Sequence, residues 1–303
     1  MKVVYFGSSE YSVAIFEYLY ENGVDIAALF TQPDKPVGRK KTLTPPVMKS
    51  FVLERGLNTP IFQPSDLKDP SIVKTISDMK PDFIVVASYG KIIPKAILDI
   101  APPINLHASI LPRFRGASPM HEMILKGDRV GGVSAMLMSE GLDEGDMLSF
   151  SFLDIKDSDD LESLSKNINI LASHLALKTL KEFKSITPIE QFHPLASYCK
   201  KIKKEHGVVT FDSANSLYRK YRAYKIWPGV MLSGGLKLTE IIGVELSGSY
   251  VAGEIIGISK ECISIGCKEG RVKISKVQSP GKGAINAVDF INGRRLKVGD
   301  ILF

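Results

Sequence analysis

The five residues 83–87, with the sequence FIVVA, form a run without a polar side chain. Such a run is typical of a strand buried on both faces of a parallel sheet. On both sides of it, short apolar runs alternate with segments of helical period. The expected strands are 3–6, 27–30, 61–63, 83–87 and 104–107, and the expected helices are 11–21, 47–54, 70–79, 94–100 and 119–126. This alternation predicts an α/β fold with a doubly wound, mostly parallel sheet.

The pattern changes after the last of these helices. Segments 131–138 and 148–154 alternate in period two, which predicts a closing pair of strands. A long helix is expected over 159–183, with Ser158 or Asp159 as its N-cap.

The last third of the chain has a different rhythm. A proline- and lysine-containing stretch resembles an exposed linker, and short strands separated by glycines follow it. They are expected at 207–210, 237–244, 253–259, 262–266 and 272–277. These features predict a small, OB-like β-barrel domain, with Trp227 in its core. The expected division is a catalytic domain over 1–188, a linker over 189–206 and a β-barrel domain over 207–303.

Charge is unevenly distributed along the chain. The formal net charge is +6, but residues 197–303 hold 18 Lys and Arg against 9 Asp and Glu, a net of +9. The remaining residues carry 21 and 24, a net of −3. A basic last third indicates a polyanionic partner such as nucleic acid, and a solvated lysine-rich surface is the alternative.

Several classes of protein are disfavoured. No stretch approaches the roughly 18 consecutive apolar residues of a membrane span. Three cysteines fit a reducing cytoplasm better than a disulfide framework. The first turn, GSSE at 7–10, has one glycine where a dinucleotide-binding fingerprint needs three.

Asn105 and His107 stand at the end of the strand expected at 104–107. Residues two apart on a strand point to the same side, so an amide donor and a titratable imidazole would lie side by side. That pair suits acyl transfer, and a polar loop after a buried strand is the alternative.

Two further loops add to this pair. Residues 88–94 follow the central strand, at the carboxyl edge where open α/β sheets bind ligands. Residues 139–146 form an acidic, glycine-punctuated loop between two expected strands. Taken singly, the first is also consistent with an ordinary strand-to-helix turn, and the second with a solvated hairpin.

Eight segments, in this order along nearly the whole chain, resemble the folate-dependent formyltransferase superfamily. They are GSSEY at 7–11, TQPDKPVGRKK at 31–41, YGKIIP at 89–94, NLHAS at 105–109, RFRG at 113–116, GLDEGD at 141–146, PG at 228–229 and PGK at 280–282. The match is closer to the members that act on methionyl initiator tRNA. Two positions depart from the pattern: the first turn usually reads Gly-Thr-Pro-Glu-Phe, and threonine usually stands at Glu144.

The resemblance implies that a monomer in the cytoplasm transfers the formyl group of 10-formyltetrahydrofolate to the α-amine of methionine on initiator tRNA. It implies that Asn105 donates to the developing oxyanion, that His107 relays protons, and that Asp143 orients His107 and favours its charged form. No metal is implied, because the formyl donor is already activated.

The resemblance also implies two binding sets. The folate set is Ser88, Tyr89, Gly90, Ile92, Ile93, Ser109, Ile110, Leu111 and Pro112, although Ile110 and Leu111 also suit a plain core. The tRNA set is Arg39, Lys40, Lys41, Lys203, Lys204, Arg219, Arg222 and Lys282. The segment Arg113–Arg115 is expected to form a wall of the substrate entrance.

Three other functions remain open at this point. The chain could be an amino-sugar or glycinamide ribonucleotide formyltransferase, which shares the Asn, His and Asp set. It could be a formyltetrahydrofolate hydrolase, in which water replaces the amine. It could also be a non-catalytic RNA-binding protein on the same scaffold, which an intact set of three catalytic residues disfavours.

Overall fold

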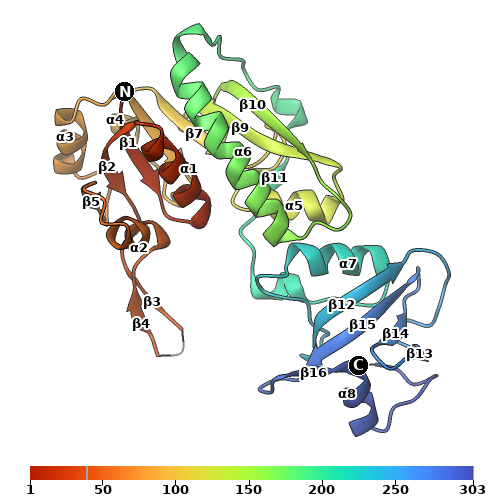
Figure 1. Cartoon of the computed structure of the whole chain (residues 1–303). Helices are drawn as coiled ribbons and strands as arrows, with labels where there is room; N and C mark the ends of the chain where they lie inside the picture. The colour runs from red at the N-terminus through yellow and green to blue at the C-terminus, as the bar shows by residue number, and fades with distance from the viewer. Residues whose placement is uncertain (39, 303) are drawn as a thin grey trace. The chain divides into compact units, whose positions relative to one another are not determined.

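The structure of this chain is a computed structural model that describes residues 1–38 and 40–302 (Figure 1). Arg39 and Phe303 lie outside the described residues. The chain forms two compact units. The first comprises Met1–Pro119, Val130–Asp154 and Ser165–Cys199, and the second comprises Met120–Arg129, Ile155–Leu164 and Lys200–Phe303.

The first unit contains a seven-stranded sheet in the order β10-β9-β7-β6-β1-β2-β5. Its strands are β1 (Lys2–Gly7), β2 (Asp25–Phe30), β5 (Ile61–Phe62), β6 (Phe83–Ala87), β7 (Pro103–His107), β9 (Val130–Leu137) and β10 (Met147–Asp154). Neighbours from β5 to β7 pair in parallel, whereas β9 pairs antiparallel with β7 and with β10. The predicted α/β fold with a mostly parallel sheet is therefore confirmed.

The central strands are buried on both faces. On one face, Val4 and Phe6 of β1 pack with Ile84 and Val86 of β6 in a single apolar cluster. On the other face, the Tyr5 ring meets a ring of helix α1 (Glu10–Glu21) edge-on, with centroids 5.3 Å apart. The uninterrupted apolar sequence of β6 follows from this two-sided burial.

Helices connect and follow these strands along the chain. They are α1 (Glu10–Glu21), α2 (Val47–Glu54), α3 (Pro70–Asp78), α4 (Lys95–Leu98), α5 (Pro119–Lys126) and α6 (Leu161–Glu182). The long helix α6 is capped by Asp160, whose Oδ1 accepts the N–H groups of Glu162 and Ser163 at 3.0 Å each. The expected cap at Ser158 or Asp159 was wrong, because the Asp159 carboxylate instead accepts the Lys156 N–H.

A hairpin stands where the sequence suggested only a basic loop. Its strands are β3 (Lys35–Val37) and β4 (Thr42–Thr44), and it projects from the first unit beside α2 (Figure 1). At its base, Lys49 Nζ lies 2.9 Å from both Asp34 carboxylate oxygens and from Gln63 Oε1. Hydrogen bonds from Gln63 and Lys49 lower the pKa of Asp34. The base of the hairpin is thereby fixed to α2.

The segment 189–199, expected as part of a linker, belongs to the first unit. Its strand β11 (Tyr198–Cys199) pairs in parallel with β8 (Arg115–Gly116), and Ile189 pairs with Met147 of β10. Two 3-10 helices, η1 (Phe183–Ser185) and η2 (His193–Leu195), also lie in this part of the chain. The domain boundaries expected at residues 188 and 207 remain predictions.

The second unit is built on an antiparallel sheet in the order β12-β15-β14-β13, with β16 paired to β15. Its elements are η3 (Lys204–Gly207), α7 (Ala214–Ala223), β12 (Lys237–Glu245), β13 (Ile255–Ile258), β14 (Ile263–Gly266), β15 (Arg271–Gln278), β16 (Ala284–Asn286) and α8 (Ala287–Gly293). The small C-terminal β-domain is confirmed.

The strand expected at 207–210 was wrong, because the chain turns through η3 and Val208 makes only an isolated bridge. Trp227 is 51% exposed and does not lie in the core.

The parallel register brings several loops to one edge of the main sheet. Gly7 aligns with Ala87, and Val86 aligns with Asn105, so β1, β6 and β7 end together. The strand order reverses between β1 and β6, the position where doubly wound sheets bind ligands. The Ser12 hydroxyl donates to the Ala87 carbonyl, which attaches α1 to the end of β6 at this edge.

Among the described residues, the structure contains no helix long and apolar enough to cross a membrane.

The His121 ring of α5 gives a test of acid stability in the second unit. Burial lowers the pKa of His121 from 6.5 to about 4. The unfolded chain therefore binds more protons than the folded chain between these values, and stability is lost as the pH falls through this window. His121→Phe keeps a ring beside Tyr224, whose centroid lies 6.2 Å away, and removes the proton uptake.

We expect the unfolding free energy of His121→Phe to fall less than that of the wild type between about pH 7 and about pH 4.5. Urea titrations followed by the fluorescence of Trp227, the single tryptophan, measure this difference. An equal loss in both proteins would contradict it.

Candidate active site

Asn105 and His107 are buried near the carboxyl end of β7, with exposed fractions of 9% and 6%. Being two positions apart, they point to the same side of the strand. Backbone pairing fixes Asn105 on both flanks, with Val86 of β6 and Met136 of β9, and fixes His107 on one flank, with Ser134 of β9. An amide and an imidazole therefore meet on a rigid support.

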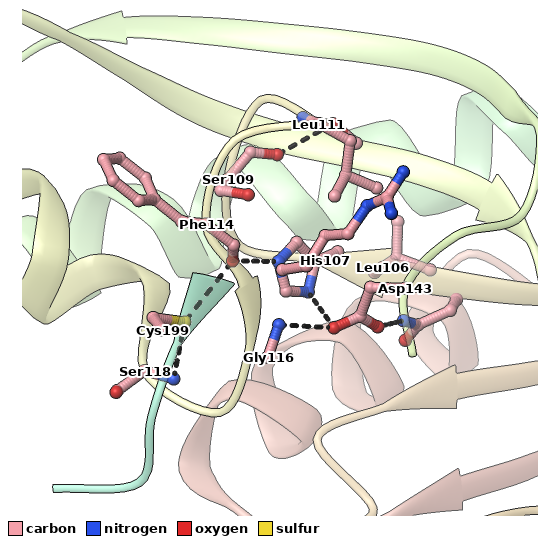
Figure 2. Close-up of polar contacts among 12 residues, drawn as sticks. Leu106, His107, Ser109, Leu111, Phe114, Gly116, Ser118, Asp143 and Cys199 are labelled. Atoms are coloured by element: carbon pink, nitrogen blue, oxygen red, sulfur yellow. Dashed lines mark hydrogen bonds and ion pairs between the residues drawn. The ribbon is translucent and has the colours of Figure 1, made fainter. Parts of the chain in front are cut away.

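Asp143 reaches this pair from the loop between β9 and β10 (Figure 2). Its Oδ2 accepts the Gly116 N–H at 2.7 Å and lies 3.6 Å from His107 Nδ1. Its Oδ1 accepts the Asn105 side-chain amide at 3.4 Å. The structure thus brings together the three side chains expected to be catalytic. Asp143 does so with φ at +52°, a backbone conformation that is costly without glycine.

The other nitrogen of His107 is fixed by the main chain. His107 Nε2 lies 2.9 Å from the Phe114 carbonyl oxygen, which can only accept, so Nε2 carries the proton (Figure 2). The other ring nitrogen, His107 Nδ1, faces Asp143. Phe114 has φ at +59°, and the Cys199 thiol donates to the same carbonyl at 3.4 Å. This partner could not be predicted from the sequence, because a main-chain carbonyl is common to every residue type.

A turn after β7 contributes four of the nine residues of the expected folate set. The Ser134 hydroxyl donates to the Ser109 carbonyl at 2.7 Å and accepts the Leu111 N–H at 3.0 Å. Ser109 donates its own hydroxyl to the Arg113 carbonyl at 2.6 Å. Ser109 and Leu111 are buried within the turn, whereas Ile110 and Pro112 are half-buried. The surface available to a ligand here comes from Ile110 and Pro112.

The loop after β6 contributes the rest of that set. Ser88 and Gly90 have positive φ values of +48° and +80° and are exposed, and Ile92 is 85% exposed. Tyr89 and Ile93 instead point into the core. Burial raises the pKa of Tyr89 to about 12, and its hydroxyl has no hydrogen-bond partner among the described residues. This loop therefore presents backbone groups and one apolar side chain to solvent.

Arg115 is fully buried and is not part of an entrance wall, which corrects that expectation for this residue. Its guanidinium donates to Gln191 Oε1 from Nε at 3.1 Å and from Nη2 at 2.7 Å. Gln191 in turn donates to the carbonyls of Asp143 and Gly145. Sequence reasoning missed Gln191, because it lies in the segment expected to be a linker.

The residues expected to bind tRNA differ in their exposure to solvent. Lys40 and Lys41 of the hairpin turn are exposed, as are Lys203, Lys204 and Lys282 of the second unit, whereas Arg39 lies outside the described residues. Arg219 is half-buried and donates to the Lys126 carbonyl at 3.0 Å. Arg222 is buried and donates to the Asp159 carbonyl at 2.8 Å. The structure corrects the expectation for Arg222, whose guanidinium holds a loop of its own unit.

Across the part of the chain that the structure describes, no group of three or more His, Cys, Asp and Glu side chains could hold a metal ion.

Two family models match the chain. The first, described as formyl transferase, matches residues 1–180, and the second, described as formyl transferase, C-terminal domain, matches residues 201–295. A methionyl-tRNA formyltransferase of Nitratiruptor sp. is 48% identical over 303 residues, which is all of both chains. The methionyl-tRNA formyltransferase of Campylobacter hominis is 51% identical over 301 residues, 99% of each chain.

Solved structures agree on the fold. An N-formyltransferase from Helicobacter canadensis, in complex with folinic acid and dTDP-3-aminofucose, aligns with a TM-score of 0.67 at 15% identity, over 92% of this chain and all of that one. HypX from Aquifex aeolicus, in complex with tetrahydrofolic acid, aligns with a TM-score of 0.64 at 17% identity. That alignment covers all of this chain and 49% of HypX, so the chain spans about half the length of HypX.

Gly116 offers a test of how tightly the site is packed. Its φ is +111°, and a Cβ placed on it would overlap the Cys199 carbonyl oxygen. We expect Gly116→Ala to lower the unfolding free energy of the first unit by about 1–3 kcal/mol, because the strain has no room to relax. Urea unfolding measures the loss. Gly234→Ala is the control, since no atom lies within 4 Å of its added Cβ, and an equal effect of both changes would contradict the expectation.

Proposed function

Because the chain belongs to the methionyl-tRNA formyltransferase family, we propose that it transfers the formyl group of 10-formyltetrahydrofolate to the α-amine of methionine on initiator tRNA. The product is N-formylmethionyl-tRNA, which is used to start translation, and we place the reaction in the cytoplasm. The observation that carries the proposal is full-length identity of 48–51% to proteins of that name. The convergence of Asn105, His107 and Asp143 at one sheet edge supports it.

Asn105 stabilises the charge that develops during transfer. As the amine nitrogen attacks the formyl carbon, negative charge builds on the formyl oxygen. The Asn105 amide donates to that oxygen, and its buried position makes the donation effective, because water does not compete there. Loss of one such donor costs about 2.7–4 kcal/mol of transition-state stabilisation in acyl-transfer enzymes.

His107 and Asp143 transfer a proton from the attacking amine to the leaving nitrogen of the folate. The attacking amine loses a proton when its bond to carbon forms, and N10 of the folate gains one when its bond to that carbon breaks. His107 Nδ1 carries the proton between them, since Nε2 is held by the Phe114 carbonyl. Asp143, 3.6 Å from Nδ1, stabilises the imidazolium formed on the way. The two protein groups end each cycle unchanged.

The two loops at the carboxyl edge are proposed to hold the folate. Planar pterin rings suit a site that combines backbone donors and acceptors with apolar side chains. The exposed residues Ser88, Gly90 and Ile92 supply such groups, as do half-buried Ile110 and Pro112. Tyr89, Ile93, Ser109 and Leu111 support these loops from within.

The exposed cations are proposed to bind the tRNA backbone. They are Lys40 and Lys41 in the first unit and Lys203, Lys204 and Lys282 in the second, with Arg39 kept as a sequence-based proposal. Lysine side chains contact phosphates without reading sequence. Arg219 is proposed to contribute through its other nitrogens, because Nη1 donates to the Lys126 carbonyl.

Formylation of charged initiator tRNA tests the function directly. With 10-formyltetrahydrofolate as donor, we expect the wild type to make formylmethionyl-tRNA and Asn105→Ala to lower kcat by about 10²–10³-fold, because one oxyanion donor is lost. Asn22→Ala, which removes an exposed amide of the first unit, is the matched control and should leave kcat unchanged. Formylation of an amino sugar, or release of formate without formylated tRNA, would overturn the proposal.

The hairpin cations are tested by salt dependence. We expect Lys40→Ala with Lys41→Ala to raise KM for the charged tRNA, to leave kcat nearly unchanged and to reduce the slope of log KM against log salt by roughly 2, one for each phosphate contact. The control pair is Lys74→Ala with Lys95→Ala, which removes two exposed helix lysines of the same unit. Equal salt slopes for the two pairs would rule out the hairpin contact.

A further inference from the structure

Arg115 is an unusual feature of the first unit, because it is a fully buried cation. Its closest partners are neutral: Gln191 Oε1 accepts two of its bonds, and the Tyr198 hydroxyl lies 3.2 Å from Nη1. Its Nη2 also lies 3.3 Å from His193 Nδ1. The carboxylate paired with it is that of Glu144, with Oε1 3.5 Å from Nη1. A buried charge is costly, so this set of contacts must hold Arg115 in a defined position.

Arg115 determines which way the Gln191 amide faces. A guanidinium has only donors, so the amide must turn its oxygen toward Arg115 and its nitrogen away from it. Gln191 Nε2 then donates to the Asp143 carbonyl at 2.9 Å and to the Gly145 carbonyl at 2.7 Å. Gln191 is 2% exposed, so water cannot replace these bonds without opening the fold. The amide clamps the backbone on both sides of Glu144.

Gly116, the residue after Arg115, also binds the loop between β9 and β10. The Gly116 N–H donates to Asp143 Oδ2, the oxygen that faces His107 Nδ1. Asp143 therefore has its carboxylate held by Gly116 and its carbonyl held by Gln191. Its left-handed backbone conformation persists only where such contacts over-determine it.

We propose that Arg115 and Gln191 are positioning residues for the reaction: they act through the Asp143 backbone and hold its carboxylate against His107. This inference rests on the proposed function. It assigns to the segment 189–199 a part in catalysis that neither the family names nor the catalytic set contains.

A merely structural role is the competing explanation. Arg115 and Gln191 also attach the segment 189–199 to the sheet, and loss of that attachment would disturb the unit without any specific effect on Asp143. The two roles separate at Gln191→Glu. This variant keeps an oxygen acceptor for Arg115, and so keeps the attachment, but it has no N–H group for the carbonyls of Asp143 and Gly145.

The experiment compares Gln191→Glu and Gln191→Ala with the wild type in formyl transfer to charged initiator tRNA. We expect both variants to lower kcat by about 10–100-fold, with KM for the formyl donor changed by less than about 3-fold, because misplacement of a catalytic group reduces the chemical step. Asn22→Ala, which removes an exposed amide that donates to the Tyr18 carbonyl in the first unit, should leave kcat unchanged. Wild-type kcat in Gln191→Glu would overturn the proposal.

A double-variant cycle shows whether the effect passes through Asp143. In an Asp143→Asn background, Gln191→Ala should cost less than about 3-fold, because the carboxylate that it positions is already absent. The same 10–100-fold loss in both backgrounds would show an independent structural role and would overturn the proposal. Single-turnover measurements at excess enzyme extend the range to slow variants.

The His107 ring provides a readout that needs no activity. In proteins labelled with ¹⁵N-histidine, we expect the Nδ1 resonance of His107 to shift in Gln191→Glu at fixed pH, because its Asp143 neighbour moves. The Nε2 resonance should stay in place, since its partner is the Phe114 carbonyl. Unchanged resonances of both nitrogens would overturn the positioning role. If the wild type does not formylate charged initiator tRNA, the proposed function fails, and this spectrum still decides the role of Gln191.

Discussion

The hydrogen bond from the Gly116 N–H to the Asp143 carboxylate is the contact on which the site depends. It joins the segment after β7 to the loop between β9 and β10, and neither segment is a regular element of the main sheet there. The sheet alone fixes only Asn105 and His107, because both lie on β7. Asp143, the third member, is held at the site by this bond. Asp143 and Phe114 both have positive φ values. Strain of this kind is expected where a site is held in a reactive arrangement.

Much of the fold follows from the sequence, for reasons visible at particular residues. The apolar run of β6 could be recognised because two-sided burial leaves no polar position in the strand. Asn105 and His107 could be paired because strand periodicity is strict. Asp143 could be named only through a family resemblance, because its approach depends on a loop conformation that no local pattern encodes.

Other features could not be predicted, and the reasons are physical. The Phe114 carbonyl and the Gly116 N–H are main-chain groups that any residue possesses. Gln191 acts across 76 positions from Arg115, so its role depends on the pairing of β8 with β11. Arg222 and Trp227 were misjudged because composition does not reveal exposure: the cation is buried against backbone carbonyls, and the aromatic ring is half exposed. A basic last third therefore overstates the number of cations that are free to meet a polyanion.

The pairing of β8 with β11 has a consequence for where this protein can be divided. Residues 189–199 supply β11, the Gln191 clamp and the Ser197 hydroxyl that accepts the Phe114 N–H at 2.9 Å. A fragment that stops at residue 188 would keep Asn105, His107 and Asp143. It would lack the residues that hold the segment 114–116 and the loop between β9 and β10. An autonomous catalytic fragment must extend at least through Cys199. Replacement of the C-terminal part of the chain by that of a relative would preserve the site only if the crossover lies after that residue.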